Sequence, residues 1–242
     1  MRSILITNDD GILSEGIVRL AAAAKRFGEV WVVAPAHQRS AASHCITLRD
    51  PLDVYPVTFP VDGVRAFSCS GMPGDCVRVG SLGVMDHKPD VVLSGINFGY
   101  NVASDVQYSA TVGAAMEASF QGINGIAISE GIHFREVTDE CLDRVLETVI
   151  ERKIPEGRIL NVNFPDCRME DYHGILEDRK VSRGMVYKDR YNAIEKLDKG
   201  GVRWMVEGIL TPEAEEGTDY RAVLDGYISI SLVNNVGYGD GD

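Results

Sequence analysis

Two adjacent carboxylates follow the first apolar run of the chain. Residues 3–7 read Ser-Ile-Leu-Ile-Thr, and Asn8, Asp9, Asp10 and Gly11 come directly after them. The run predicts a buried strand, and because neighbouring side chains of a strand point to opposite faces, Asp9 and Asp10 can converge only where the backbone has left the strand. Carboxylate oxygens are preferred ligands of Mg²⁺ and Mn²⁺. The pattern indicates either a divalent-cation site or an ordinary turn in which Asp10 caps the next helix.

Two more oxygen-bearing side chains follow other predicted strands. Ser40 comes after the strand predicted at residues 30–34, and Asn97 lies between two glycines after the strand predicted at residues 89–94. The carboxyl ends of parallel strands form the ligand-binding edge of a doubly wound sheet, so both residues could face the crevice of the aspartate pair. The structural alternatives are an ordinary polar loop for Ser40 and a left-handed turn position for Asn97.

A predicted helix at residues 109–120 begins with three small residues, Ser109, Ala110 and Thr111. Its first turn would offer unpaired backbone N–H groups and two hydroxyls, which suits a phosphate group. Hydroxyls are also common at helix N-termini that bind nothing, so this motif only supports a phosphate site.

Alternating strands and helices must position these side chains. At 242 residues the chain can bury a large core, and up to residue 165 short apolar runs alternate with amphipathic stretches. Ser14 and Thr138 are predicted helix N-caps. This order predicts an α/β fold with a mostly parallel sheet flanked by helices, and a catalytic core spanning residues 1–167.

The C-terminal residues 168–242 have a different character, with more charge and weaker periodicity. Short strands predicted at residues 185–187 and 202–206 suggest an extended hairpin, followed by a short helix and a closing strand at residues 227–232. An isolated hairpin is marginally stable in water, so we expect this arm to pack on the core or on another subunit.

Charge and cysteine content exclude several classes of function. The net charge of −12 repels a phosphate backbone, which argues against polymeric nucleic acid as a partner but leaves small phosphorylated ligands possible. The five cysteines are scattered without a Cys-x-x-Cys pair, so neither a disulfide framework nor a zinc site is expected. No membrane span or signal peptide is apparent, and we expect a cytoplasmic protein with no membrane partner.

An ordered set of motifs resembles the SurE (survival protein E) family of metal-dependent acid phosphatases and nucleotidases over essentially the whole chain. The set comprises residues 6–11 (ITNDDG), 33–35 with Arg39-Ser40, 73–77 (PGDCV), 94–97 (SGIN), 108–117 (YSATVGAAME), 160–163 (LNVN), and 217–219 before Gly226-Tyr227. A single Asp-Asp-Gly would be a weak signal, whereas this ordered set is specific.

The resemblance implies a Rossmann-like fold, one divalent metal ion per subunit, Mg²⁺ or Mn²⁺, and hydrolysis of nucleoside monophosphates to nucleoside and phosphate. It also implies a C-terminal hairpin exchanged between the subunits of a homodimer or homotetramer. The site residues that it implies are metal ligands at Asp9, Asp10, Ser40 and Asn97, with Ser109, Ala110 and Thr111 near the phosphate.

Two positions depart from the family pattern. His44 stands where the family commonly has asparagine, and Ala110 stands where it commonly has glycine. Neither change removes an implied metal ligand. An imidazole in place of an amide could alter contacts to substrate phosphate or sugar, so His44 is a candidate substrate-binding residue, and the family's substrate preference transfers less securely than its chemistry.

We predict metal-assisted attack of water on a phosphomonoester, with Asp9 or Asp10 assisting proton removal. A dinucleotide-dependent oxidoreductase is disfavoured, because the first strand is followed by Asn-Asp-Asp-Gly rather than Gly-x-Gly-x-x-Gly. A non-catalytic nucleotide-binding or scaffold protein is the other alternative. The motifs leave open the physiological metal, the base, the 5′ or 3′ position, polyphosphate cleavage, and dimer against tetramer.

Overall fold

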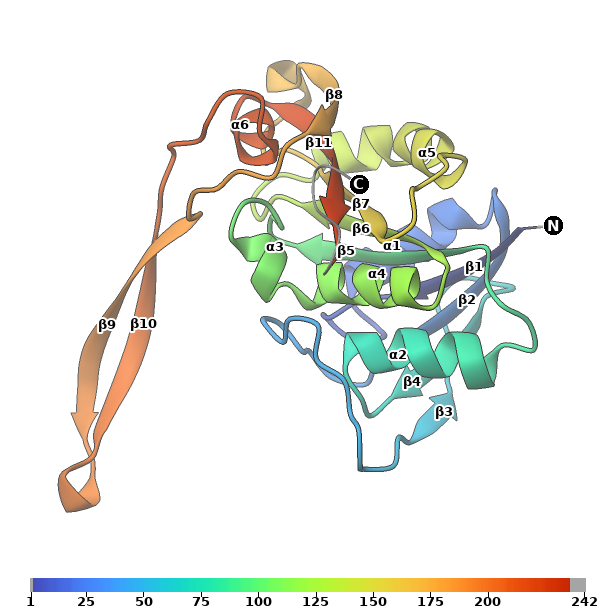
Figure 1. Cartoon of the computed structure of the whole chain (residues 1–242), viewed down its shortest axis with the longest axis horizontal. Coiled ribbons are helices and arrows are strands. Elements are labelled where there is room, and N and C mark those ends of the chain that lie inside the picture. Colours follow the sequence, from blue (N-terminus) through green and yellow to red (C-terminus); the bar gives the residue numbers. More distant parts are fainter. Residues whose placement is uncertain (1, 236–242) are drawn as a thin grey trace.

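One mixed sheet organises the computed structural model, which describes residues 2–235 (Figure 1). Its strand order is β3-β4-β2-β1-β5-β6-β7-β11-β8, and the six strands from β4 to β7 in that order are parallel. The edge strand β3 and strand β11 run antiparallel to their neighbours β4 and β7. The strands are β1 (Arg2–Thr7), β2 (Gly28–Pro35), β3 (Val54–Pro56), β4 (Arg65–Cys69), β5 (Val91–Phe98), β6 (Asn124–Glu130), β7 (Arg158–Asn163), β8 (Gly174–Arg179) and β11 (Tyr227–Asn234).

Helices cover both faces of this sheet. Helices α1 and α5 pack against each other on one face, and α2 and α4 pack on the other (Figure 1). Along β1, Ile4 and Ile6 join the core under α1 and α5, whereas Leu5 joins the core under α2 and α4. The helices are α1 (Glu15–Ala24), α2 (Pro73–Val79), η1 (Gly80–Val84), α3 (Asp105–Tyr108), α4 (Ala110–Phe120), α5 (Glu136–Ile150), η2 (Met169–Asp171), η3 (Asp198–Gly200) and α6 (Asp219–Leu224).

The architecture confirms the predicted α/β fold with a mostly parallel sheet, and β1 and β5 are buried as their apolar runs required. No helix in residues 2–235 combines the length and apolar character that crossing a bilayer requires. The predicted division at residues 167 and 168 remains a prediction, since β8 and β11 join the main sheet while only the hairpin projects from it (Figure 1). Residues 236–242 of the predicted arm lie outside the described residues.

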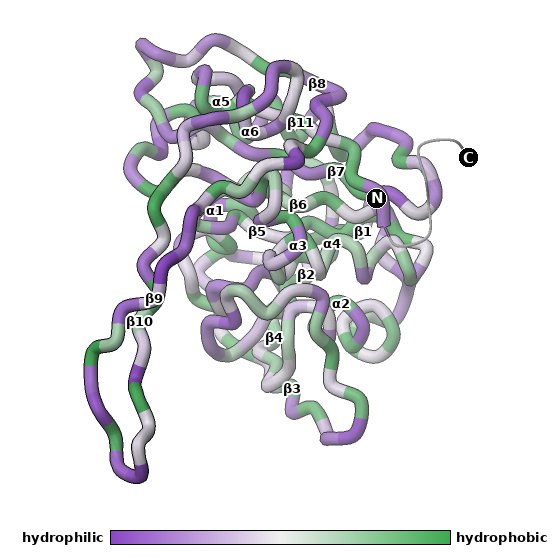
Figure 2. The backbone as a smooth tube through the Cα atoms, turned by 60° about the vertical axis from the view of Figure 1, so that its left-hand side comes forward, coloured by the Kyte–Doolittle hydropathy of each residue, from purple (hydrophilic) through white to green (hydrophobic). Residues whose placement is uncertain are grey.

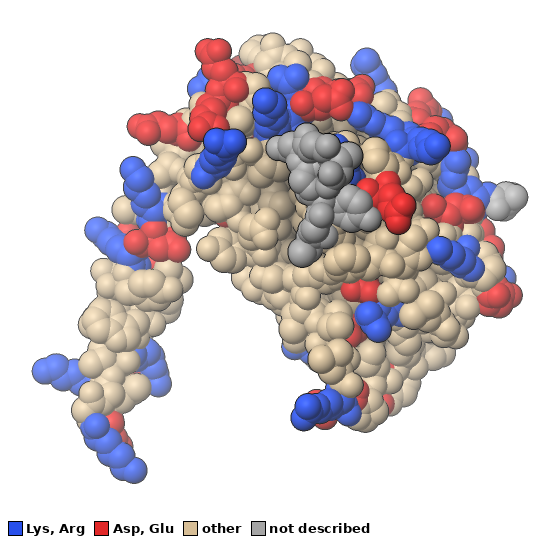
Figure 3. All heavy atoms as spheres, in the orientation of Figure 1, with Lys and Arg blue, Asp and Glu red and all other residues tan. Residues whose placement is uncertain are grey.

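A projecting hairpin confirms the predicted arm. Strands β9 (Tyr187–Lys196) and β10 (Val202–Leu210) form a separate antiparallel sheet, and every residue in them is exposed. Strand β9 is mostly hydrophilic, whereas β10 is mostly hydrophobic with Arg203 and Glu207 as its charged residues (Figure 2). Charged side chains lie near both the root and the free end of the arm, with uncharged ones between them (Figure 3). The strand predicted at residues 185–187 overlaps β9 only at Tyr187, and the strand predicted at residues 202–206 covers only the first part of β10. Polar residues on both strands obscure their apolar positions.

One predicted helix start is wrong. Helix α5 begins at Glu136 with Arg135 as its N-cap, and Thr138 is buried inside the helix with its hydroxyl unpartnered. Glu136 and Asp139 both complement the helix dipole, so the acidic first turn indicated the region of the start but not its residue. Ser14 is the N-cap of α1 as predicted, although its hydroxyl accepts a hydrogen bond from Asn8 Nδ2 at 2.7 Å instead of capping the helix.

Candidate functional site

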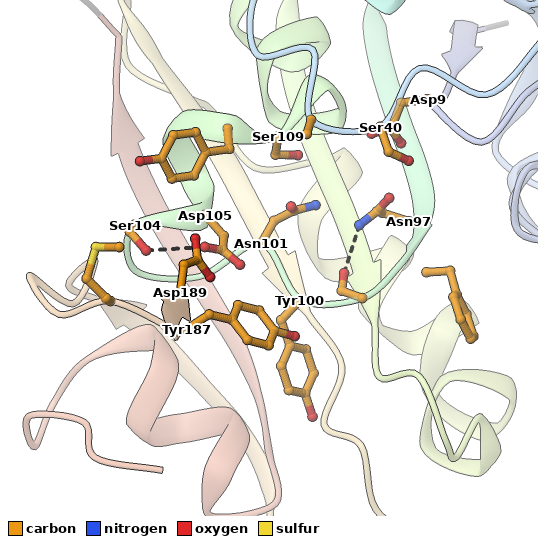
Figure 4. A pocket seen from close by; sticks show the side chains of 15 residues that line it. Asp9, Ser40, Asn97, Tyr100, Asn101, Ser104, Asp105, Ser109, Tyr187 and Asp189 are labelled. Atoms are coloured by element: carbon orange, nitrogen blue, oxygen red, sulfur yellow. Dashed lines mark hydrogen bonds between the residues drawn. The ribbon is translucent and has the colours of Figure 1, made fainter. Parts of the chain in front are cut away.

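A pocket of about 360 Å³ opens where β1 and β5 end and extends to the root of the arm (Figure 4). Asp9, Ser40 and Asn97 lie together at one end of the pocket, and Ser109 at the start of α4 lies beside them. The structure therefore brings together side chains from two loops, the end of β5 and one helix start, which the sequence places up to a hundred residues apart.

Asp9 is almost fully buried at the end of β1. Its side chain is 3 % exposed, and its Oδ1 accepts a hydrogen bond of 2.7 Å from the Thr111 hydroxyl. Burial raises the pKa of Asp9 from its ordinary value to about 6, and the charge of Asp10 adds to this effect while the Thr111 bond opposes it. The protein only weakly stabilises the negative charge of a carboxylate with this pKa. A nearby cation would stabilise that charge.

Asp10 is held by the loops on either side of it. Its Oδ1 accepts a hydrogen bond from Gln38 Nε2 at 3.3 Å, and its Oδ2 accepts one from the backbone N–H of Phe98 at 3.4 Å. Gln38 also donates to the Ser40 hydroxyl at 3.0 Å, so one amide links Asp10 to Ser40. Burial raises the pKa of Asp10 as well. Asp10 lines a smaller neighbouring pocket that shares Phe98 with the main one.

Asn97 completes this set from the end of β5. Its amide Nδ2 donates to the backbone oxygen of Gly99 at 2.8 Å, which commits the donor side of the amide to its own loop (Figure 4). The carbonyl oxygen is the remaining polar atom of the side chain, and a carbonyl oxygen is a suitable ligand for a hard cation.

The start of α4 holds the three predicted phosphate residues in different environments. Ser109 is the N-cap, accepts a hydrogen bond from the Val112 N–H at 3.1 Å, and lines the pocket. Ala110 and Thr111 are fully buried and do not line it, and the Thr111 hydroxyl is committed to Asp9. Contacts from these residues to a phosphate stay a prediction, to which the backbone N–H groups of the first turn contribute.

His44 lies outside the pocket. Its Nε2 lies 2.9 Å from Glu117 Oε2, and its ring stacks on Phe120 with 5.5 Å between the centroids, further along α4. Gly113 permits this approach, because a Cβ there would come 2.7 Å from the Ser43 oxygen. The structure does not bring His44 to the other candidate residues, and its contact with substrate stays a prediction.

A buried amide network that sequence reasoning did not assign to the site supports one wall of the pocket. The backbone N–H of Asn101 donates to Asn163 Oδ1 at 2.8 Å, and the backbone oxygen of Asn101 accepts from Asn161 Nδ2 at 2.7 Å. Asn101 itself donates to the Ser129 hydroxyl at 2.7 Å and lines the pocket. The signal for this network was present in the sequence, since two asparagines interrupt the buried apolar strand β7.

The residues of the outer half of the pocket were also not predicted from the sequence. Asp105 of α3 lines it together with Tyr187 and Asp189 from the root of the arm (Figure 4). Tyr108 of α3 also lines the pocket. No local motif joins these residues, because the arm approaches α3 only in the folded chain. Among the described residues that line the pocket, none is Lys, Arg or His.

The donor set at the inner end fits a divalent cation. Two carboxylates, one hydroxyl and one amide carbonyl supply oxygen atoms, the ligand type that Mg²⁺ and Mn²⁺ prefer. The described residues contain no cluster of three or more His, Cys, Asp or Glu side chains placed to hold a metal, which leaves this mixed oxygen set as the candidate. The raised pKa values of Asp9 and Asp10 mean that a cation bound here would stabilise both carboxylates.

Comparisons with known proteins find similar sequences and a similar structure along most of the chain. The model of the family described as Survival protein SurE matches residues 4–185. The 5'-nucleotidase SurE of Pelobacter propionicus is 40 % identical over 235 residues, covering 94 % of this chain and 91 % of that protein. The 5'-nucleotidase SurE of Aquifex aeolicus is 40 % identical over 237 residues, covering 96 % and 91 %. The crystal structure of the SurE protein from Aquifex aeolicus superimposes with a TM-score of 0.80 at 35 % identity, covering 96 % of this chain and 93 % of that one.

Proposed function

Because the chain belongs to the Survival protein SurE family, we propose that it is a divalent-metal-dependent 5'-nucleotidase that hydrolyses nucleoside monophosphates to nucleoside and phosphate. The observation that carries this proposal is the meeting of Asp9, Ser40 and Asn97 in one pocket, with Asp10 linked to Ser40 through Gln38. We propose one ion per subunit, Mg²⁺ or Mn²⁺, held by Asp9, Asp10, Ser40 and Asn97.

The chain's own residues would divide the chemistry between them. A bound divalent ion supplies positive charge that stabilises the phosphoryl oxygens as negative charge develops on them. Ser109 and the N–H groups at the start of α4 would bind the phosphate from the side of the helix dipole. Asp9 or Asp10 would accept the proton of the attacking water as the general base.

Phosphate release from AMP, measured with and without EDTA, tests the proposal. We expect release that EDTA abolishes and that added Mn²⁺ or Mg²⁺ restores. A protein that binds AMP but releases no phosphate under any of these conditions would be a nucleotide-binding protein, and the proposal would be wrong. Loss of activity in Asp10→Asn with p-nitrophenyl phosphate and Mn²⁺ would support the ligand role of Asp10, and near-normal turnover would remove it.

We also propose that the segment 168–242 joins subunits through the arm, in a homodimer or homotetramer that works in the cytoplasm. Large apolar side chains are half exposed on both strands of the arm, among them Tyr191, Trp204 and Ile209. An isolated two-stranded sheet with such side chains gains stability by packing on another surface. All five cysteines are unpaired, in keeping with a reducing compartment.

The oligomeric state tests the role of the arm. Trp204 is 56 % exposed, and replacing it by aspartate should weaken packing of the arm on a second copy. Light scattering after size exclusion should give a multimer for the wild type and a smaller species for Trp204→Asp, with the charge-matched tip variant Lys199→Gln unchanged. A wild-type protein that is monomeric at micromolar concentration would overturn this part of the proposal.

A further inference from the structure

We propose that the outer half of the pocket is a nucleoside-recognition site in which Asp105 and Asp189 accept hydrogen bonds from the substrate and Tyr187 provides a face for its base. The inference rests on the proposed function, since it takes the phosphate to be held at the inner end. It assigns a specificity role to the root of the arm, far in sequence from the motifs of the inner end.

The two carboxylates lie near each other at the outer end of the pocket. Figure 4 shows Asp105, from the start of α3, beside Asp189 of β9, well separated from Asp9, Ser40 and Asn97. The Ser104 hydroxyl donates to Asp105 Oδ1 at 3.2 Å and orients that carboxylate. Burial raises the pKa of Asp105, and the charge of Asp189 adds to the effect. No other hydrogen bond from a described residue competes for the Asp105 oxygens.

The arm is built to leave Asp189 and Tyr187 room on this side. Asp189 lies opposite Gly208 in the register of β9 and β10. A Cβ on Gly208 would come 3.3 Å from Asp189 Oδ1 and 3.2 Å from Tyr187 Cδ1, tighter than ordinary contacts. Glycine at this position therefore gives both side chains freedom to adjust around a bound molecule.

The charge of the pocket defines the ligand that fits it. Carboxylates only accept hydrogen bonds, and no cationic side chain among the described lining residues competes for them. The matching ligand brings O–H or N–H donors to the outer end, as the ribose hydroxyls or the exocyclic amine of a nucleoside do. A second or third phosphate group extending toward this end would meet like charge, so monophosphates are favoured over di- and triphosphates.

Aromatic side chains supply the other half of the recognition. Tyr187 and Tyr108 line the pocket while remaining 40 % and 55 % exposed, so their rings are accessible to a ligand. Stacking of a base on one aromatic ring is worth about 1–3 kcal/mol, and it accepts any base because every base has a flat face. The combination predicts weak preference among bases and a stronger requirement for a nucleoside with hydrogen-bond donors.

The test compares two substrates that share the phosphate but differ in the rest. In Asp189→Asn, kcat/KM for AMP should fall about tenfold, because a charged acceptor is replaced by a neutral amide oxygen that forms a weaker hydrogen bond. With p-nitrophenyl phosphate, which has no donors, kcat/KM should stay within about twofold. The exposed turn variant Asp62→Asn removes the same charge far from the pocket and should change neither value. Tyr187→Phe should keep the AMP rate, and Tyr187→Ala should lower it.

Further substrates identify the donor. If ribose hydroxyls bind the carboxylates, the wild type should have a lower kcat/KM for 2'-deoxy-AMP than for AMP, and Asp189→Asn should not change the value for 2'-deoxy-AMP. If the exocyclic amine binds the carboxylates, kcat/KM for IMP should instead be lower than for AMP in the wild type and unchanged by Asp189→Asn. Hydrolysis of ADP relative to AMP should rise in Asp105→Asn and Asp189→Asn, because less negative charge then meets the second phosphate.

The outcomes separate this inference from the proposed function. If Asp189→Asn lowers kcat/KM equally for both substrates, or lowers it for neither, the inference is overturned while metal-dependent hydrolysis by the wild type stands. If the wild type hydrolyses neither substrate, the proposed function fails, and equilibrium binding of AMP in the presence of EDTA then decides the inference. A Kd unchanged by Asp189→Asn would reject it, and a Kd raised about tenfold would support it.

Discussion

The bond between Thr111 and Asp9 offers the sharpest test of how the pocket is organised. Thr111 is fully buried, and its hydroxyl donates to Asp9 Oδ1 at 2.7 Å. Replacing it by valine removes this hydroxyl and keeps the side chain close to its original shape. Asp9 would lose its fixed orientation and one source of stabilisation for its negative charge.

General values for such hydrogen bonds give the size of the effect. A hydrogen bond to a charged group contributes about 1.5–3 kcal/mol, which corresponds to a factor of about 10 to 150 in a binding constant. Groups that orient metal ligands affect metal affinity or activity by a similar factor, about 10 to 100. We therefore expect Thr111→Val to weaken Mn²⁺ binding at least about tenfold. The Thr111 bond also lowers the pKa of Asp9, so its loss should raise that pKa above about 6.

Calorimetric titration with Mn²⁺ and the Mn²⁺ dependence of p-nitrophenyl phosphate hydrolysis measure this effect. Because protons and the cation compete for Asp9, affinity should fall as the pH drops through about 6, and in Thr111→Val this fall should begin at a higher pH. Thr111→Ser keeps the hydroxyl and should restore affinity. Thr138→Val removes another buried hydroxyl, one without a partner in the structure, and should leave affinity unchanged. Wild-type affinity in Thr111→Val would refute the reasoning.

Two other substitutions probe the same site from different directions. Burial holds the pKa of Asp9 near 6 instead of 3.8, so the folded metal-free protein binds its proton more tightly than the unfolded chain and loses stability as the pH rises between these values. In EDTA above pH 6, Asp9→Asn should therefore raise the free energy of unfolding by about 1–3 kcal/mol, as measured by urea denaturation. An unchanged free energy of unfolding would contradict this account. Asn163→Ala should lower the free energy of unfolding by about 2 kcal/mol, because the buried N–H of Asn101 loses its acceptor. The same variant should raise KM for AMP. Equal urea midpoints for this variant and the wild type would count against the role of the network.

The repeating core was predictable because its signals are local. The apolar runs of β1, β2 and β5, the N-cap position of Ser14 and the small-residue start of the helix at residues 109–120 each depend on a few neighbouring residues, and the structure places elements there. The start of α5 was misplaced because several residues near position 136 favour a helix N-terminus, and tertiary packing, which buries Thr138, decided among them.

The candidate site was predictable only in part, for a related reason. Asp9 and Asp10 follow β1, and Ser40 follows β2. Asn97 lies at the end of β5. The rule that ligands bind at the carboxyl edge of a parallel sheet placed all four residues at one edge, whereas their roles as ligands were implied only by the family resemblance. The position of Asp189 at the pocket could not be foreseen, because it depends on the direction in which the arm leaves the core. His44 failed to reach the pocket for an equally non-local reason, the close approach of its loop to Gly113.

The strand order has a consequence for the order in which the protein folds during synthesis. Strand β11 lies between β7 and β8, pairing Ile230 with Val162 on one side and Ile228 with Ile175 on the other. A nascent chain that has not yet reached Tyr227 has an uncovered β7 edge, which invites association with other chains. Premature termination before this strand would therefore be expected to yield aggregation-prone products, even though every residue of the inner pocket had already been translated.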